Sequence, residues 1–289
     1  AGLIASAGII APVIPPSIGF VIFGVAGNVS ISKLFMAGIV PGILLGASLW
    51  ITWWWLARRE VVQVPPRKSM GEILVAMREA TWALVLPLIV VFGLKFGIFT
   101  PTEAGVAACV YAFVIGVFVY RELAWRDLYR LFVQAAKTTA VVVFMIAAAL
   151  VSAFLITTSE VPQQVAAMLE PFIGQPKLLM FVIMVLIVVI GTALDFAPTL
   201  MILTPVLMPI IKQAGIDPIY FGVLFIINNS IGLITPPVGI VLNVVCGISK
   251  ISMSELMDGL WPFLWAELIV LFLLVLFPSL VLVPLKWLM

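Results

Sequence analysis

The 289-residue chain carries little charge, because Asp, Glu, Lys and Arg make up only 10% of it. An ordinary soluble domain has roughly 25% charged residues. Apolar residues account for 64% of the chain, and the mean hydropathy is +1.29. A chain of this composition cannot bury its apolar surface in one water-soluble core. The sequence therefore predicts an all-α polytopic membrane protein.

Several residue types with characteristic chemistry are scarce or missing. The chain has no histidine, and its two cysteines, Cys109 and Cys246, lie far apart in apolar runs. These absences argue against zinc, haem and Ser-His-Asp chemistry. No glycine is followed by lysine, so the Gly-Lys pair of a nucleotide-binding P-loop is absent. The net charge of +2 is too small to indicate a nucleic-acid partner. We expect no catalytic residues and no organic cofactor.

Apolar runs that suit membrane helices occur along the whole chain, at residues 1–27, 37–57, 82–99, 103–120, 131–157, 177–193, 198–213, 218–249 and 259–285. The connectors at 58–68 and 121–130 carry excess Lys and Arg, and the positive-inside rule places both on the cytoplasmic side. The runs 177–193 and 198–213 are each only about 25 Å long as helices. They therefore predict a re-entrant hairpin that enters from outside, with its tip at residues 194–198.

Two of the runs contain a Pro-Pro pair and form an internal repeat. A shift of 221 residues relates Pro15, Pro16, Met36, Gly38 and Pro41 to Pro236, Pro237, Met257, Gly259 and Pro262. The side assignment gives the two copies opposite directions through the membrane. Inverted copies of a broken helix are typical of secondary transporters that bind their cargo near the midplane. Chance similarity is the alternative. By the same shift, the partner of the hairpin precedes Ala1, so we expect a first hairpin before it.

The breaks and the hairpin tip predict a monovalent cation site. Proline frees backbone carbonyls in a helix, and freed carbonyls inside a membrane protein suit Na⁺. The hairpin tip adds side-chain oxygens in an otherwise apolar stretch. The predicted Na⁺ ligands are Thr192, Asp195, Thr199, Gly232, Thr235, Pro236, Gly239, Pro15, Pro16 and Gly19. In the alternative interpretation the breaks are structural kinks and Asp195 caps the returning arm of the hairpin.

Three further polar residues are candidates for substrate binding. Asn228 and Asn229 immediately precede the second break, and Ser17 lies in the first. The two asparagines either complete the ion shell or hydrogen-bond to neighbouring helices. Glu267 lies within the last apolar run, and nothing nearby in the sequence identifies a partner for it.

The chain resembles the C-terminal two-thirds of the large membrane subunit of tripartite ATP-independent periplasmic (TRAP) transporters. The resemblance runs along all 289 residues and rests on several motifs together. The motifs are Ile-Pro-Pro-Ser-Ile (14–18), Phe-Thr-Pro-Thr-Glu-Ala-Gly (99–105), Leu-Asp (194–195), Leu-Thr-Pro (203–205), Gly-Ile-Asp-Pro (215–218), Phe-Gly (221–222) and Ile-Gly-Leu-Ile-Thr-Pro-Pro-Val-Gly (231–239).

The resemblance implies Na⁺-coupled uptake of an organic acid (a C4-dicarboxylate, a sialic acid-like sugar or a keto acid) across a bacterial inner membrane. It also implies a periplasmic substrate-binding protein, a small membrane subunit and an elevator mechanism. By this likeness, residues 1–36 and 177–258 move, whereas 37–176 and 259–289 form a scaffold. The amphipathic stretches 70–81 and 121–130 are then arms along the inner face. The alternative is a Na⁺/divalent-anion symporter of a related inverted-repeat fold that needs no binding protein.

Overall fold

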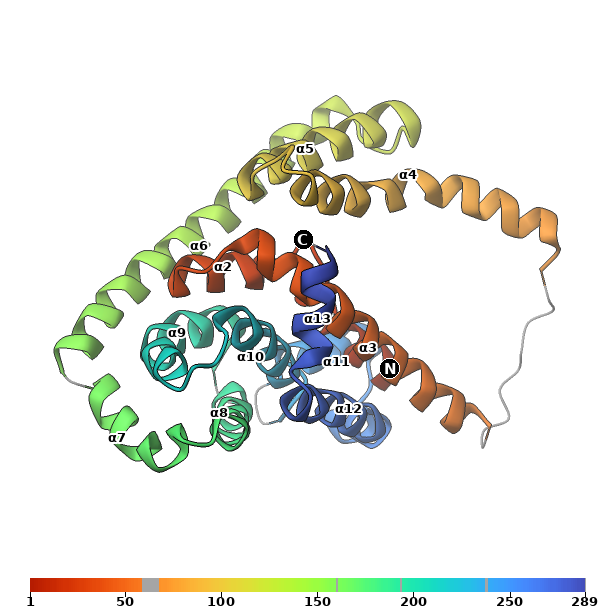
Figure 1. The fold of residues 1–289 in the computed structure, drawn as a ribbon. Helices are drawn as coiled ribbons and strands as arrows, with labels where there is room; N and C mark the ends of the chain where they lie inside the picture. The colour runs from red at the N-terminus through yellow and green to blue at the C-terminus, as the bar shows by residue number, and fades with distance from the viewer. Residues whose placement is uncertain (59–67, 160, 193, 237–238, 289) are drawn as a thin grey trace. The chain divides into compact units, whose positions relative to one another are not determined.

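The computed structural model describes residues 1–58, 68–159, 161–192, 194–236 and 239–288. Every regular element in these ranges is a helix (Figure 1). Five of the helices are long and apolar enough to cross a membrane: Ile31–Ala57, Met70–Lys95, Pro101–Val119, Phe196–Gln213 and Met253–Leu276. The prediction of an all-α polytopic membrane protein is therefore confirmed.

The chain divides into two compact units. The first unit contains residues 1–56 and 145–289, and the second contains residues 57–144. Helices of the first unit are α1 (Gly2–Gly8), α2 (Ile18–Gly27), α3 (Ile31–Ala57), α7 (Val161–Ile173), α8 (Pro176–Gly191), α9 (Phe196–Gln213), α10 (Pro218–Gly232), α11 (Ile240–Ser249), α12 (Met253–Leu276) and α13 (Ser279–Leu288). The long helix α6 (Trp125–Thr158) begins in the second unit and ends in the first.

The second unit is built around a pair of packed helices, α4 (Met70–Lys95) and α5 (Pro101–Val114), the latter continued by a π-helical turn at Ile115–Val119. Two tyrosines join the pair: the Tyr111 hydroxyl donates to the carbonyl of Trp82 at 2.8 Å, and the Tyr120 hydroxyl donates to that of Glu79 at 2.6 Å. Both tyrosines lie toward the C-terminal end of this helix, and their bonds hold it against α4.

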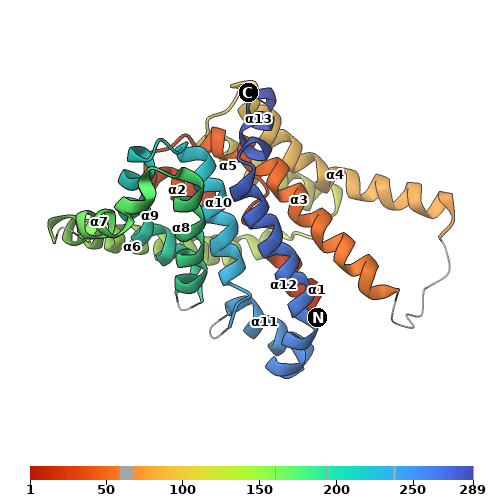
Figure 2. The same ribbon diagram turned by 60° about the horizontal axis from the view of Figure 1, so that its bottom comes forward.

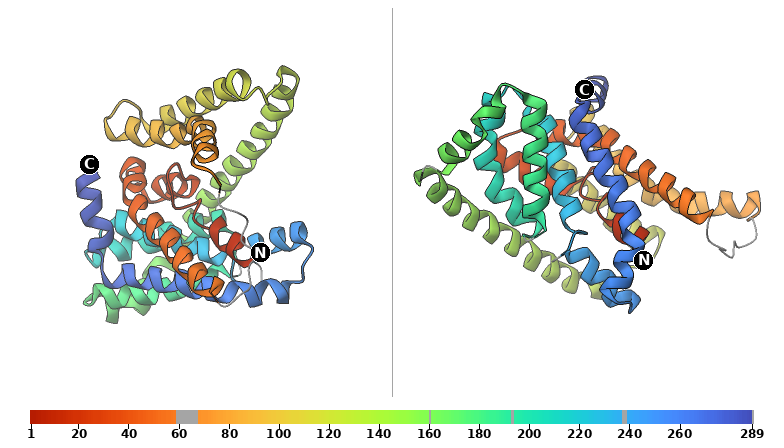
Figure 3. Two further views of the ribbon diagram at one scale, coloured as in Figure 1. Left: turned by 90° about the vertical axis from the view of Figure 1, so that its right-hand side faces the viewer. Right: turned by 90° about the horizontal axis from the view of Figure 1, so that it is seen from below.

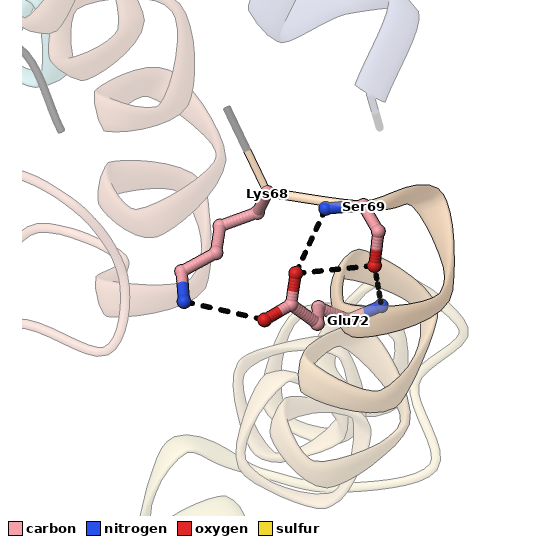
Figure 4. Close-up of polar contacts among 3 residues, drawn as sticks. All are labelled: Lys68, Ser69 and Glu72. Carbon is pink, nitrogen blue, oxygen red and sulfur yellow. Dashed lines mark hydrogen bonds and ion pairs between the residues drawn. The ribbon is translucent and has the colours of Figure 1, made fainter. Parts of the chain in front are cut away.

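Both helices of this pair begin at a capping box, in which a side chain at each end satisfies a free backbone N–H. At the start of α4, the Ser69 hydroxyl accepts from the Glu72 N–H, while Glu72 accepts from the Ser69 N–H and pairs with Lys68 at 3.3 Å (Figure 4). Thr100 and Glu103 form the same box at the start of α5.

Several helix bounds differ from the apolar runs. The stretch 70–81 is continuous with the apolar part of α4, and residues from Trp125 onward are continuous with the apolar part of α6, because no helix breaker lies between the two parts in either case. The segment between the apolar runs 131–157 and 177–193 contains α7, which packs on α8 and α9. The last apolar run is divided at Phe277 and Pro278 into α12 and α13.

The internal repeat is visible in the helix boundaries of the first unit. Helices α11 and α12 begin 222 residues after α2 and α3, at Ile240 and Met253 against Ile18 and Ile31. The helices α2 and α11 both end at a residue in the left-handed region, Asn28 with φ 52° and Lys250 with φ 54°. Each copy is therefore a short helix, a break, a second short helix and a long helix. Pro237, in the second break, lies outside the described residues.

The two broken helices run in opposite directions. The first half of one copy, α1, packs against α11 and α12, whereas its second half, α2, packs against α10. Since α1 precedes α2 and α10 precedes α11, this exchange of neighbours requires an antiparallel arrangement. Figure 2 shows it within the first unit: α10 leads down to α11, beside which α1 lies. The predicted inversion of the repeat is present in the fold.

Candidate functional site

The predicted hairpin is formed by α8 and α9, and it lies against α10 (Figure 3). At its open end, Pro176 and Lys177 of α8 line a cavity of about 230 Å³ together with Asp217 and Tyr220 at the start of α10. At the other end, Gly191 of α8 touches Gly232, the last residue of α10. The helices α8 and α10 are therefore parallel, and the hairpin tip lies beside the start of the second break.

The hairpin tip is built by residues that cap its two helices. The Thr192 hydroxyl donates to the carbonyl of Val189 at 2.8 Å at the end of α8. Asp195 has extended backbone geometry and is the N-cap of α9, where its Oδ1 accepts from the Phe196 N–H at 2.7 Å. The buried Thr199 hydroxyl donates to the carbonyl of Asp195 at 2.7 Å. The capping interpretation of Asp195 is thus correct, and its other carboxylate oxygen remains available.

Asn228 and Asn229 connect α10 to the two arms of the hairpin. The Asn228 amide Nδ2 donates to the carbonyl of Met184 on α8 at 2.6 Å, and the Asn229 Nδ2 donates to the carbonyl of Phe196 on α9 at 2.7 Å. Both side chains are buried, and each Oδ1 has no hydrogen-bond partner among the described residues. A buried amide oxygen without a partner costs about 1–3 kcal/mol. These two acceptors beside the hairpin could therefore be satisfied by a ligand.

Gly191 and Gly232 are in close contact beside Asn229. A Cβ on Gly232 would lie 2.8 Å from the Gly191 carbonyl oxygen, so any side chain here would collide with backbone. A Cβ on Gly191 would lie 3.8 Å from Asn229 Oδ1. The ends of two helices and one unpartnered oxygen thus meet in one place, where α8 directs its C-terminal carbonyls.

The second break starts with tight turns. The N–H groups of Leu233, Ile234 and Thr235 each donate to the carbonyl three residues earlier, at 3.0–3.1 Å. The Thr235 hydroxyl donates to the carbonyl of Ile231 at 2.8 Å. Gly239 has φ 39°, a conformation that other residues rarely adopt, and is the N-cap of α11. Pro236 is exposed.

The first break also follows a series of turns, between Ser6 and Ile14. Pro15 is buried, and Pro16 is exposed. Ser17 is the N-cap of α2, where its hydroxyl accepts from the Phe20 N–H at 3.3 Å and donates to the carbonyl of Pro12. The Ser17 hydroxyl is thus already used as a donor and as an acceptor within the first break. This favours a structural role over the predicted substrate contact.

The hairpin tip and the breaks lie close together. A Cβ on Gly19, at the start of α2, would lie 2.8 Å from the ring of Phe196 and 3.2 Å from Ile226 of α10. A Cβ on Gly8, at the end of α1, would lie 3.7 Å from Val241 of α11. The structure therefore brings the tip residues, Gly19, Asn229 and Gly232 into one neighbourhood. None of the contacts described above joins that group to Pro15, Pro16, Pro236 or Gly239.

Sequence reasoning missed two residues of this neighbourhood, Gly191 and Phe196. Each acts through its backbone, Gly191 by close approach and Phe196 as the acceptor for Asn229. The only available signal was position, since both flank the predicted tip.

The chemistry of the neighbourhood is that of neutral oxygens with one carboxylate. No group of three His, Cys, Asp or Glu side chains that could hold a metal occurs among the described residues. The hydroxyls of Thr192, Thr199 and Thr235 donate to backbone carbonyls, which leaves their lone pairs free to accept. Oxygen donors of this kind suit a hard monovalent cation and do not suit zinc or copper.

Comparison with known proteins identifies the family. Residues 1–280 match the family model described as the tripartite ATP-independent periplasmic transporter, DctM component. The chain is 52% identical over 287 residues to the 2,3-diketo-L-gulonate TRAP transporter large permease protein of Escherichia coli, covering 99% of this chain and 68% of the relative.

Two further relatives carry other substrate names. The C4-dicarboxylate TRAP transporter large permease protein of Pseudomonas aeruginosa is 34% identical over 288 residues, covering 100% of this chain and 67% of the relative. The sialic acid TRAP transporter large permease protein of Vibrio cholerae is 34% identical over 278 residues, covering 96% and 65%.

The relatives are named transporter permeases and not enzymes, which confirms that prediction. The match, together with the apolar helices, identifies a multi-pass protein of the bacterial inner membrane. The chain belongs to the large permease family of the TRAP transporters.

Proposed function

We propose that this permease couples the entry of Na⁺ to the uptake of an organic acid, and that a coupling ion binds at the hairpin tip. The observation that carries the proposal is the unpartnered, buried Oδ1 of Asn229 beside the Gly191–Gly232 contact. A cation there would supply the interaction that this oxygen lacks. The carbonyl ends of α8 and α10 would supply further oxygen ligands.

The hairpin tip adds oxygen ligands that favour a cation over a water molecule. Asp195 keeps one carboxylate oxygen free of the capping bond, and the hydroxyls of Thr192 and Thr199 keep free lone pairs. One carboxylate with several neutral oxygens balances a single positive charge. Thr235, Pro236, Gly239, Pro15, Pro16 and Gly19 belong to the same proposal as the break residues that shape the site.

The hairpin is re-entrant in this proposal, although α9 by itself reaches the length of a membrane-crossing helix. Helices α8 and α9 have 16 and 18 residues, about 24 and 27 Å at 1.5 Å per residue, against a hydrocarbon layer of about 30 Å. With both arms returning to one side, the tip and its ion would lie inside the membrane, between the two broken helices.

The cargo is proposed to be an organic acid, because the named substrates of the three relatives all carry a carboxylate. The 52% identity to the diketogulonate permease favours a keto sugar acid. A periplasmic binding protein that delivers the acid and a small membrane subunit are the proposed partners. Uptake that needs no binding protein would instead favour the divalent-anion symporter.

The test is Na⁺-dependent uptake by the full transporter, reconstituted with its small subunit and binding protein. Asn229→Ala should raise the Na⁺ concentration for half-maximal uptake by about tenfold or more, the equivalent of about 1.4 kcal/mol or more of ion binding. Asn229→Asp keeps an oxygen but loses the N–H that donates to the Phe196 carbonyl, so it should raise this concentration less than Asn229→Ala does.

Asn228→Ala is the matched control, since Asn228 is equally buried and also bonds to the hairpin, on its other arm. It should change the Na⁺ requirement less than Asn229→Ala does. The reverse order, or equilibrium ²²Na⁺ binding unaffected by Asn229→Ala, would contradict the proposed ion position.

A further inference from the structure

Glu267 is a buried acid that the ion site does not use. It lies in the interior of α12, a 24-residue apolar helix, and its exposed fraction is 0%. Neither carboxylate oxygen has a hydrogen-bond partner among the described residues. An ionised carboxylate so placed pays a desolvation cost that no counter-charge repays.

Glu267 lies on the buried face of α12 that meets α10. Glu267, Leu271 and Leu274 are all fully buried and follow the spacing of one helix face, at i, i+4 and i+7. At Leu274 this face meets α10, because the Tyr220 hydroxyl donates to the carbonyls of Leu274 and Val275 at 3.0 and 3.4 Å.

The depth of Glu267 follows from helix geometry. Helices α10 and α12 run antiparallel in the first unit (Figures 2 and 3). Seven residues separate Glu267 from Leu274, about 10 Å along the axis. The same distance along α10 from Tyr220 reaches Ile227 and Asn228. Glu267 therefore lies at the level of Asn228, whose buried Oδ1 also lacks a donor.

Within the described residues, no Lys or Arg of the helices that pack most closely on α12 lies at this level. These helices are α1, α8, α10 and α11. Helix α1 has no titratable side chain and contributes the buried, neutral hydroxyl of Ser6. The titratable groups of the other three are Lys177 near the start of α8, Tyr220 and the cap Asp217 at the start of α10, and Cys246 and the cap Lys250 of α11. On α12 itself, Glu255 and Asp258 lie near the start.

The lysines are too far along the bundle to pair with Glu267. Lys177 lines the same cavity as Tyr220. It therefore lies near Leu274, about 10 Å along α12 from Glu267. Lys250 precedes the start of α12, which is about 20 Å along the axis from Glu267. The group that supplies both neutrality and a hydrogen-bond donor here is a proton.

We propose that Glu267 is a proton-binding site, occupied by H⁺ while α12 is packed on α8 and α10. The neutral acid can donate to an acceptor such as Asn228 Oδ1, whereas the ionised form cannot. With the proton bound the buried group is neutral, so we expect the packed state to lose stability when alkaline pH removes the proton. The site is separate from the proposed Na⁺ ligands at the hairpin tip and does not depend on them.

The test combines infrared spectroscopy with pH-dependent stability of the purified transporter complex. The wild-type protein at neutral pH should show a protonated-carboxyl stretching band that Glu267→Gln lacks. Glu267→Gln, which imitates the neutral acid, should keep Na⁺-dependent uptake and lose less stability than wild type on going to alkaline pH. Glu255→Gln is the control, because Glu255 is exposed on the same helix, and it should retain both the band and the wild-type pH dependence.

Two results would overturn the proposal. Absence of the Glu267 band from the wild-type protein would show that the carboxylate is ionised; this measurement does not require the variant to fold. A folded Glu267→Gln protein whose uptake no longer responds to Na⁺ would show that Glu267 is a cation ligand. Loss of Na⁺ coupling in Asn229→Ala should leave the infrared band of Glu267 and the pH dependence of stability unchanged.

Discussion

At the scale of single residues, Asp195 performs a structural task and is proposed to perform a second one. Its Oδ1 caps α9 through the Phe196 N–H, and its backbone carbonyl accepts from the Thr199 hydroxyl. The other carboxylate oxygen is the proposed ion ligand. A cap requires only an acceptor, whereas a ligand for Na⁺ in an apolar setting benefits from the negative charge. The two tasks can therefore be separated by substitution.

Asp195→Asn should leave the thermal stability of the protein close to wild type, because asparagine caps helices as well as aspartate does. It should raise the Na⁺ concentration for half-maximal uptake, because the charge is lost. Asp195→Ala should do the same and also destabilise the protein by about 1 kcal/mol. Uptake kinetics and thermal unfolding measure the two effects.

Asp217 provides the comparison for both variants. It caps α10 by accepting from the Ile219 and Tyr220 N–H groups, at the opposite end of the hairpin from the tip. Asp217→Ala should lower stability without altering the Na⁺ requirement. An altered Na⁺ requirement in Asp217→Ala would mean that any lost cap changes ion binding, and Asp195 would then need no role as a ligand.

The sequence predicted which polar residues belong to the candidate site but not the hydrogen bonds that they form. Thr192, Asp195 and Thr199 stood out because polar side chains are rare in an apolar run. The sequence could not distinguish Asn228 from Asn229, since adjacent residues differ by about 100° around a helix and their neighbours come from distant segments. Their contacts with Met184 and Phe196 span 44 and 33 residues.

At the scale of helices, side-chain caps fix several starts. Ser69, Thr100 and Asp217 each begin a helix through a side-chain bond. The errors arose where hydropathy changes inside one helix, as in α4, because the hydrogen-bonding pattern of a helix continues across such a change. Helix α7 was missed because its segment is not continuously apolar. Polarity indicates exposure more directly than it indicates the end of a helix.

Close contact between α8 and α10 gives a prediction for these elements. Gly232→Ala should destabilise the protein by about 1–3 kcal/mol, because its methyl group would lie 2.8 Å from the Gly191 carbonyl oxygen, which belongs to rigid backbone. Thermal unfolding of the purified protein measures the change.

Gly247→Ala is the control, since Gly247 is also helical and has nothing within 4 Å of an added Cβ. It should be neutral or stabilise α11 by up to about 1 kcal/mol. Equal effects of the two substitutions would contradict the packing of α8 on α10 at this point.

At the scale of the molecule, the repeat was predicted from five residue pairs and is seen in helix order, helix ends and neighbours. Its direction was derived from charged connectors, and the structure supports it independently through the packing of α1 on α11 and α2 on α10. The sequence could not predict how near the two copies lie, because that depends on side chains such as Phe196 fitting over Gly19.

A disulfide can test the antiparallel arrangement. In a background without Cys109 and Cys246, Gly8→Cys with Val241→Cys should cross-link in membranes under mild oxidation, because a Cβ at Gly8 lies 3.7 Å from the Val241 side chain. Altered mobility in gels under non-reducing conditions measures the yield.

The comparison pair is Gly8→Cys with Ile248→Cys, seven residues or about 10 Å further along α11. It should cross-link poorly. A higher yield for this pair would mean that α1 does not meet the start of α11, and the inverted arrangement would be wrong.

The side-chain amide of Asn229 joins two events that would otherwise be independent. Its nitrogen donates to the Phe196 carbonyl at the start of α9, while its oxygen has no hydrogen-bond partner among the described residues. An amide group is flat and rigid, so its two ends turn together. Any rotation that moves the oxygen away also breaks the hydrogen bond to Phe196, and under the proposed function the departure of the coupling ion and the release of the hairpin tip become one motion.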